Sequence, residues 1–263
     1  MTTAAMHIAR TGLDAQDTRM RVISNNLANV STTGFKRDRA SFETLSYQVV
    51  TAAGAQSTAE SNYATGLNLG TGVRVQGTSR TETQGSMTET GNSLDLALDG
   101  NGYFQVQMPG GQLGYTRAGN FSRSPEGMLI TSQGYQVMPG ITVPANATQI
   151  TIGTDGTVSA TVPGQTESQN LGQIQVASFP NAAGLQSNGD NFLLETASSG
   201  AANLGVPGED GRGRVRQGSL EASNVNVVEE LVDMIETQRA YEVNSKMISA
   251  TDDMLKYVNQ NLS

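Results

Sequence analysis

Cysteine is absent from this chain, which excludes disulfide bridges, thiolate metal sites and cysteine nucleophiles together. Tryptophan is also absent, aromatic residues make up 5% and apolar residues 37%, against 30 glycines. This is little core material for a chain of 263 residues, because a compact globule of that size encloses a large apolar interior. Part of the chain is therefore expected to bury apolar surface against other molecules.

Histidine and positive charge are scarce as well. His7 is the only histidine, so neither a Ser-His-Asp triad nor a zinc site has the residues that it needs. The formal net charge of −8 argues against a nucleic-acid partner, which would require a basic face. We expect no cofactor, no metal ion and no catalytic residue, and therefore a structural subunit rather than an enzyme.

Long apolar runs are missing too. The first residues, MTTAAMHIAR, contain no apolar core or cleavage site of a secretory signal peptide. No segment approaches the roughly 18 apolar residues that a membrane helix needs. The chain is therefore expected not to be embedded in a membrane, and to be either cytoplasmic or exported by a route that leaves its N-terminus intact.

Proline is missing from both ends, because all seven prolines lie between residues 109 and 207. Near the N-terminus, apolar residues recur every seven positions, with further apolar residues three positions behind. This spacing predicts a coiled-coil seam. The residues expected at this interface are Met6, Leu13, Met20, Ile23 and Leu27.

The last forty residues repeat the pattern, with a wider apolar stripe that includes Ala240, Val243, Met247, Ala250, Met254 and Val258. Ser223 or Asn224 is expected to cap this helix, and its early acidic residues suit the helix dipole. The residues expected at this second interface are Val227, Leu231, Met234, Tyr241, Ile248 and Leu255, and Leu262 continues the repeat.

Between the ends the apolar period changes to two. Leu94, Leu96 and Leu98 alternate with polar or small residues, the turn 99–102 follows, and Phe104 and Val106 resume the alternation. This pattern predicts a β-hairpin. Further turns at 125–127, 133–134 and 155–156 predict more short strands.

The predicted fold class is α+β, with long N- and C-terminal helices pairing as a coiled coil, an extended linker arm and a central all-β domain. The expected parts are an N-terminal helix at 1–33, the arm at 34–91, the β domain at 92–205, and a linker with the C-terminal helix at 206–263. The arm is rich in Gly, Ser, Thr and Ala, with little core of its own.

The charges of the two ends are complementary. Residues 1–39 carry six basic and three acidic side chains, and residues 220–263 carry three basic and eight acidic ones. Opposite net charges favour pairing of the two helices, within one chain or between chains. Each helix alone would leave on the order of 10 kcal/mol of apolar burial unrealised, at roughly 1.5–3 kcal/mol per large side chain. We therefore predict assembly with copies of the same chain, in a head-to-tail arrangement that builds a helical fibre.

Three asparagines near the end of the first helix, Asn25, Asn26 and Asn29, form a polar edge beside its apolar stripe. Their amides are expected to hydrogen-bond backbone carbonyls of neighbouring helices. Ordinary capping of the helix C-terminus accounts for one of the three.

The segment at 24–36, SNNLANVSTTGFK, resembles the N-terminal signature of the rod and hook proteins of the bacterial flagellum. The segments at 221–235 and 238–242 are similar to the C-terminal signature of the same family, and those at 94–104 and 115–121 to parts of its β domain. The arm and the chain length resemble the rod subunits more than the longer hook proteins.

The resemblance implies a structural subunit that polymerises into a rigid hollow drive shaft, with the paired helices lining its inner tube and the arm bracing adjacent subunits. The implied partners are copies of itself, proximal rod proteins, the hook protein, the peptidoglycan and outer-membrane ring proteins, and the flagellar type III export apparatus. The implied location is the part of the basal body that spans the periplasm.

Three alternatives stay open from the residues. A different rod subunit or a hook-type paralogue would share the same signatures. A periplasmic glycan hydrolase would need two carboxylates facing a cleft. A secreted adhesin would stay monomeric once its ends are removed.

Overall fold

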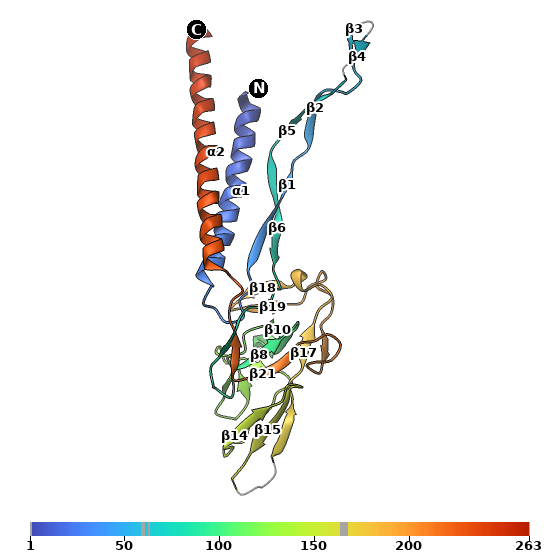
Figure 1. The fold of residues 1–263 in the computed structure, drawn as a ribbon, viewed down its shortest axis with the longest axis vertical. Coiled ribbons are helices and arrows are strands. Elements are labelled where there is room, and N and C mark those ends of the chain that lie inside the picture. The colour runs from blue at the N-terminus through green and yellow to red at the C-terminus, as the bar shows by residue number, and fades with distance from the viewer. Residues whose placement is uncertain (1, 59–60, 63, 164–167, 263) are drawn as a thin grey trace. The chain divides into compact units, whose positions relative to one another are not determined.

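The structure, a computed structural model, describes residues 2–58, 61–62, 64–163 and 168–262 (Figure 1). Two helices and many short strands make it an α+β protein with a central β-rich region, which confirms the predicted class at that level. The chain forms two compact units. Unit 1 comprises residues 1–27, 38–79 and 226–263, and unit 2 comprises residues 28–37 and 80–225.

The two helices belong to unit 1, apart from the last residue of the first. α1 spans Thr2–Ala28 and α2 spans Val227–Leu262. Neither contains proline, so neither is interrupted. The Oδ1 atom of Asn226 accepts a hydrogen bond from the backbone N–H of Val228 at 3.1 Å and caps α2. The predicted caps Ser223 and Asn224 are wrong, because the chain reaches Val227 before it turns helical.

The remainder of unit 1 is an arm of paired strands. β2 (Tyr47–Thr51) pairs antiparallel with β5 (Leu67–Gly70), and β3 (Gln56–Thr58) pairs antiparallel with β4 (Ser61–Asn62). β1 (Asp38–Thr44) pairs with β6 (Val73–Arg80) to form the base of the arm (Figure 1). Every described residue of β5 is exposed, so this ribbon has almost no core of its own.

Unit 2 is built on a nine-stranded sheet. Its main path runs β11-β12-β13-β9-β10-β19-β18, and β17 joins β9 to β20. The strands of this sheet are β9 (Tyr103–Gln107), β10 (Leu113–Thr116), β11 (Ser122–Arg123), β12 (Leu129–Ile130), β13 (Gln136–Val137), β17 (Val176–Ser178), β18 (Gln186–Gly189), β19 (Phe192–Leu194) and β20 (Asn203–Gly205).

Smaller sheets complete unit 2. The strands are β7 (Met87–Glu89) with β22 (Ser219–Glu221), β8 (Leu96–Asp99) with β21 (Arg214–Gln217), and the meander β14 (Gln149–Ile152), β15 (Thr157–Thr161) and β16 (Gln169–Gln173). The core includes Phe104, Val158 and Ile174, each fully buried. A second cluster surrounds Tyr103 and Tyr115.

Three predicted turns of the β region are confirmed. Residues 125–127 join β11 to β12, residues 133–134 join β12 to β13, and residues 155–156 join β14 to β15, each within an antiparallel pair. At the last turn Ile152 lies opposite Val158, as the alternation predicts.

The predicted hairpin around residues 99–102 is wrong. β8 pairs with β21, and β9 pairs with β10, β13 and β17, so the two strands flanking this turn belong to different sheets. The physical reason is that β8 is buried on both faces, since Leu96, Ala97 and Leu98 are each 1% exposed. The alternation of apolar and polar or small residues therefore did not indicate a strand with one exposed face. Gly100 and Gly102 adopt φ of 113° and 135°, which carries the chain from one sheet to the next.

Candidate assembly interface

α1 and α2 contact each other inside unit 1 and run antiparallel (Figure 1). The Nδ2 atom of Asn26, near the end of α1, donates to Oε2 of Glu230, near the start of α2, at 3.2 Å. Arg19, two turns before Asn26 in α1, pairs with Asp233, about one turn after Glu230 in α2, at 3.1 Å. This ion pair joins one basic residue of the first helix to one acidic residue of the second within the same chain.

The predicted interface residues of α1 differ in burial. Ile23 and Asn26 are buried, Met6, Leu13, Met20 and Leu27 are half-buried, and Asn25 is exposed. Asn29 lies just after the helix, where its Oδ1 atom accepts a hydrogen bond from the hydroxyl of Thr32. The structure therefore brings Asn26 and Ile23 into the packed part of unit 1.

The predicted interface residues of α2 are half-buried or exposed. Met234, Ile248 and Leu255 are half-buried, whereas Val227, Leu231 and Tyr241 are exposed. Val258 and Leu262 fall outside the side chains that the structure describes. These residues remain proposals as an interface between copies of the chain.

A second side of α2 carries large apolar side chains that are open to solvent, with the exposed charges of Glu236, Arg239 and Lys246 among them. The apolar side chains are Val228, Val232, Ile235, Val243, Met247, Met254 and Tyr257. We call this set the outer face of α2. Val228 and Tyr257 are each 70% exposed, which is unusual for large apolar side chains gathered on one stripe. The widened stripe in the sequence indicated part of this face, and spacings of three and four residues between 228 and 235 would have revealed the rest.

The arm also exposes large apolar side chains. Tyr47, Val49 and Val50 on β2 and Leu67 and Leu69 on β5 are each about half exposed or more. A two-stranded ribbon of this kind is marginal in water. The arm is therefore a second surface with apolar area to bury.

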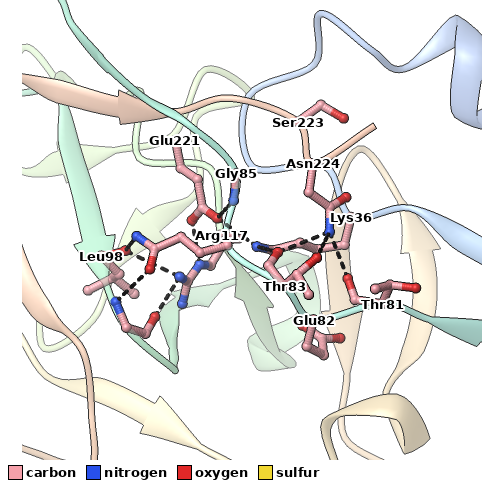
Figure 2. A network of polar contacts seen from close by, with 12 residues as sticks. Lys36, Thr81, Glu82, Thr83, Gly85, Leu98, Arg117, Glu221, Ser223 and Asn224 are labelled. Atoms are coloured by element: carbon pink, nitrogen blue, oxygen red, sulfur yellow. Dashed lines mark hydrogen bonds and ion pairs between the residues drawn. The ribbon is translucent and has the colours of Figure 1, made fainter. Parts of the chain in front are cut away.

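A buried polar network in unit 2 ties three distant segments together (Figure 2). The carboxylate of Glu221, 1% exposed, accepts from Nζ of Lys36 at 2.6 Å and from Nε of Arg117 at 2.6 Å. The backbone N–H of Gly85 donates to the same carboxylate at 3.0 Å. We call this the Glu221 network. It joins the segment after α1, the segment after the arm and the strand before α2.

Asn224 extends the same connection. Its Nδ2 atom donates to the backbone carbonyls of Thr81 and Thr83, each at 2.9 Å, and its Oδ1 atom accepts from the N–H of Arg37 at 2.7 Å. Two glycines, Gly34 and Gly85, allow the backbones of these segments to approach each other closely. A Cβ on Gly34 would lie 2.6 Å from the carbonyl carbon of Arg117, and one on Gly85 would overlap the carbonyl oxygen of Ala222.

Electrostatics favour the ionised form of this network. Burial by itself raises the pKa of the Glu221 carboxyl, but Arg117, Lys36 and the Gly85 N–H outweigh it and hold that pKa below its usual range. Burial lowers the pKa of the Lys36 ammonium, and Glu221 opposes that change. Sequence spacing carried no signal for these contacts, because the partners lie as far apart as 185 residues in the chain.

A groove of about 490 Å³ in unit 2 has two carboxylates in its lining. Glu82 and Asp210 line it, together with Tyr103. Oε2 of Glu82 accepts from the Tyr103 hydroxyl at 2.6 Å, and Asp210 pairs with Arg212 at 3.0 Å. Burial, followed by the charge of Glu82, raises the pKa of the Tyr103 hydroxyl. Both carboxylates thus have partners of their own.

Within the described ranges, no group of three or more His, Cys, Asp or Glu side chains is placed to hold a metal ion. No helix among the residues that the structure describes has the length and apolarity to cross a membrane. His7 is exposed on α1.

Three family models match the chain. Residues 6–36 match the model described as flagella basal body rod protein. Residues 97–160 match that of the flagellar hook protein FlgE/F/G D1 domain, and residues 216–261 match that of the flagellar basal body rod FlgEFG protein C-terminal. The first and last matches cover most of the two helices, and the middle one covers much of unit 2.

Curated relatives match over nearly the whole length. Flagellar basal-body rod proteins FlgG from Buchnera aphidicola subsp. Acyrthosiphon pisum and subsp. Schizaphis graminum are 50% and 49% identical to this chain, over 97% of it and 98% of each relative. FlgG from Caulobacter vibrioides is 49% identical over the same shares. The chain belongs to the flagellar basal-body rod protein family that these FlgG proteins represent.

Proposed function

We propose that this chain polymerises, through the outer face of α2, into the rigid hollow distal rod that transmits motor torque to the hook. As a member of the rod protein family the chain is a structural subunit of the flagellar basal body, and it is not an enzyme. The periplasmic location, the hollow form and the specific neighbours are part of the proposal.

The single observation that supports polymerisation best is the exposure of the outer face of α2. Burying a Val, Ile or Met side chain contributes roughly 1.5–3 kcal/mol. The outer face has six such residues and Tyr257, which together represent on the order of 10 kcal/mol, part of which is offset by the entropy lost on association. A second copy of the chain is the partner that supplies the same gain at every subunit.

The difference in helix length supports the same idea. α1 has 27 residues and α2 has 36. The end of α1 lies beside the start of α2, where Asn26 contacts Glu230. Because the two helices are antiparallel, the longer α2 extends past the start of α1. At 1.5 Å per residue the extension is about 13 Å. Met254 and Tyr257 lie on this extension with 61% and 70% of their surface exposed.

In the proposed rod the two helices of each subunit pair as a coiled coil and line the inner tube. Residues 1–33 and 206–263 would form this tube, residues 34–91 would brace adjacent subunits, and residues 92–205 would face outward. The half-exposed apolar ribbon of β2 and β5 supports the bracing role of the arm. The predicted interface residues of the two helices would then be buried between neighbouring copies of the chain.

The proposed partners are copies of this chain, proximal rod proteins, the hook protein, the ring proteins of the peptidoglycan and outer membrane, and the type III export apparatus. Membership of the rod family supports self-assembly and axial neighbours. Export through that apparatus would deliver the chain to the periplasm without a cleaved signal peptide.

Val232→Asp tests the proposal on the outer face of α2. Val232 is 51% exposed, so the substitution should leave the circular dichroism and melting temperature of the monomer unchanged. Polymers in electron micrographs should disappear, because each interface would bury an unpaired carboxylate. The matched control is Ser245→Asp, which places the same charge at an exposed position about 140° around the helix from Val232 and should polymerise normally. Normal tubes from Val232→Asp would contradict the proposal.

Leu27→Asp and Ile248→Asp test the predicted seam in the same way. Both side chains are half-buried, so these variants should lose polymerisation and also weaken the contact between α1 and α2. If either variant built a functional rod, the assignment of its residue to the interface would be wrong.

A further inference from the structure

The side of α2 that packs on α1 carries a row of four polar residues beside the half-buried Met234 and Ile248. Glu230 and Thr237 are 0% exposed, and Asn244 and Thr251, at the same spacing of seven residues, are half-buried. We call these four residues the polar row. At 100° per residue, the outer face of α2 is turned about 130° away from the polar row. α2 therefore buries polar residues on this side while seven large apolar side chains remain exposed on the outer face.

Asn26 holds the first member of the polar row. It is 1% exposed, and its Nδ2 atom donates both to Oε2 of Glu230 at 3.2 Å and to the carbonyl of Asp38 at 2.9 Å. Its Oδ1 atom accepts from the N–H of Asp38 at 2.9 Å. One buried amide thereby ties the end of α1, the start of β1 and the start of α2.

Two further contacts follow the same alignment. Arg19 pairs with Asp233, and the side chain of Asn244 lies against Gly12, where an added Cβ would come within 3.0 Å of Nδ2. Together with the bond between Asn26 and Glu230, these contacts follow in order along one antiparallel alignment of the two helices.

The apolar repeats cannot select that register on their own. Because they recur every seven residues, sliding α2 by one heptad, about 10.5 Å, again places apolar residues opposite each other. The same slide would carry Glu230 and Asn26 apart and leave a buried carboxylate and a buried amide without each other. A single buried polar position is known to specify register in paired helices at a cost in stability.

We propose that Asn26 and Glu230 act as a register lock, which selects one alignment of α1 on α2 and thereby fixes where along α1 the outer face of α2 is presented to a second copy of the chain. The selection of register is a property of the monomer, and only its consequence for assembly rests on the proposed function. Asn26 and Glu230 are positioning residues, since neither belongs to the outer face that the second copy would cover.

Engineered disulfides test the lock directly, because the chain contains no cysteine of its own. Gly12→Cys with Asn244→Cys reports the observed register, and Gly12→Cys with Thr251→Cys reports a slide of one heptad. Each pair is oxidised in dilute monomer, confirmed by sedimentation, and cross-linking is read from gel mobility. In the native background only the first pair should cross-link. Equal cross-linking of both pairs there would overturn the lock.

The same two pairs are then placed in a background with Asn26→Leu and Glu230→Leu. The proposal predicts loss of selectivity, with the shifted pair cross-linking as well as the matched one. Glu230→Gln is the control, since its amide oxygen still accepts from Asn26, and it should keep the selectivity. Unchanged selectivity in the double leucine background would overturn the proposal. Where that background does not fold, Asn26→Ser, whose side chain is too short to reach Glu230, takes its place with the same outcomes.

Polymerisation is measured separately on the cysteine-free forms of these variants. Selective cross-linking in a native chain that forms no polymer would refute the proposed function and leave the lock intact. Normal polymers from the double leucine variant, together with lost selectivity, would refute the link between register and assembly.

Discussion

Unit 2 and unit 1 treat apolar side chains in opposite ways. In unit 2, Phe104, Val158 and Ile174 are each fully enclosed. In unit 1, Val228 and Tyr257 on α2 and Val49 on the arm are more than 60% exposed. Unit 2 therefore carries its own core, whereas unit 1 leaves apolar surface exposed. From this difference we expect unit 2 to be stable alone and unit 1 to be completed by assembly.

The largest effect expected from this comparison is the outcome of removing residues 226–263. Polymerisation should be abolished, because the outer face of α2 and the contact with α1 are both lost. Unit 2 should still fold, since Glu221 and Asn224 remain in the shortened chain. Electron microscopy and a thermal melt of the β-rich unit check the two parts. Residual tubes, or an unfolded unit 2, would break the division between the units.

Next in size is the contrast between Phe104→Ala and Val243→Ala. Phe104 is 0% exposed in the core of unit 2, so its truncation should lower the free energy of unfolding by about 3–5 kcal/mol. Val243 is 58% exposed, and its truncation should change the stability of the monomer by less than about 0.5 kcal/mol while weakening polymers. Chemical denaturation measures the first quantity, and the critical concentration for assembly measures the second. Equal stability losses would contradict the comparison.

Glu221→Gln should cost unit 2 a comparable amount, about 3–5 kcal/mol, because it leaves Lys36 and Arg117 buried without a counter-charge. The exposed ion pair of Arg216 with Glu89 supplies the control. Glu89→Gln should cost at most about 1 kcal/mol. Urea denaturation of the monomer compares the free energies of unfolding of the two variants. A similar small decrease for both would show that the Glu221 network does not stabilise unit 2.

Acid should weaken unit 2 through the same carboxylate. Because the pKa of Glu221 is lower in the folded chain than in the unfolded chain, its contribution is fully present above the unfolded value of about 4.3 and is lost as the pH falls through the folded value. The melting temperature of unit 2 should therefore decline below about pH 4. Glu221→Gln should flatten that decline, and an identical pH profile for both proteins would contradict the assignment.

The smallest effect is expected at the cap of α2. Asn226→Ala removes the hydrogen bond to the Val228 N–H and should reduce helix stability by about 1 kcal/mol. Amide hydrogen exchange in the first turn of α2 should accelerate while unit 2 is unaffected. Ser223→Ala is the control at the position that the sequence suggested, and it should leave exchange in α2 unchanged.

Much of the fold could be predicted from local chemistry. Proline-free ends with apolar residues every seven positions indicated the two helices, and the turns at 125–127, 133–134 and 155–156 indicated antiparallel strands that the structure contains. These features depend on residues close in the chain. The signatures at the two ends also identified the family that the relatives confirm.

The rest was decided by contacts between distant segments. The sequence suggested a hairpin at 99–102 and a cap at Ser223 or Asn224, but β8 pairs with β21 more than a hundred residues later, and Asn224 is committed to Thr81 and Thr83. The periodicity of α2 showed that it has apolar residues every seven positions, yet not how α2 aligns along α1. In the proposed lock, Asn26 and Glu230 decide that alignment, because a buried amide and carboxylate must meet, whereas apolar residues tolerate several alignments.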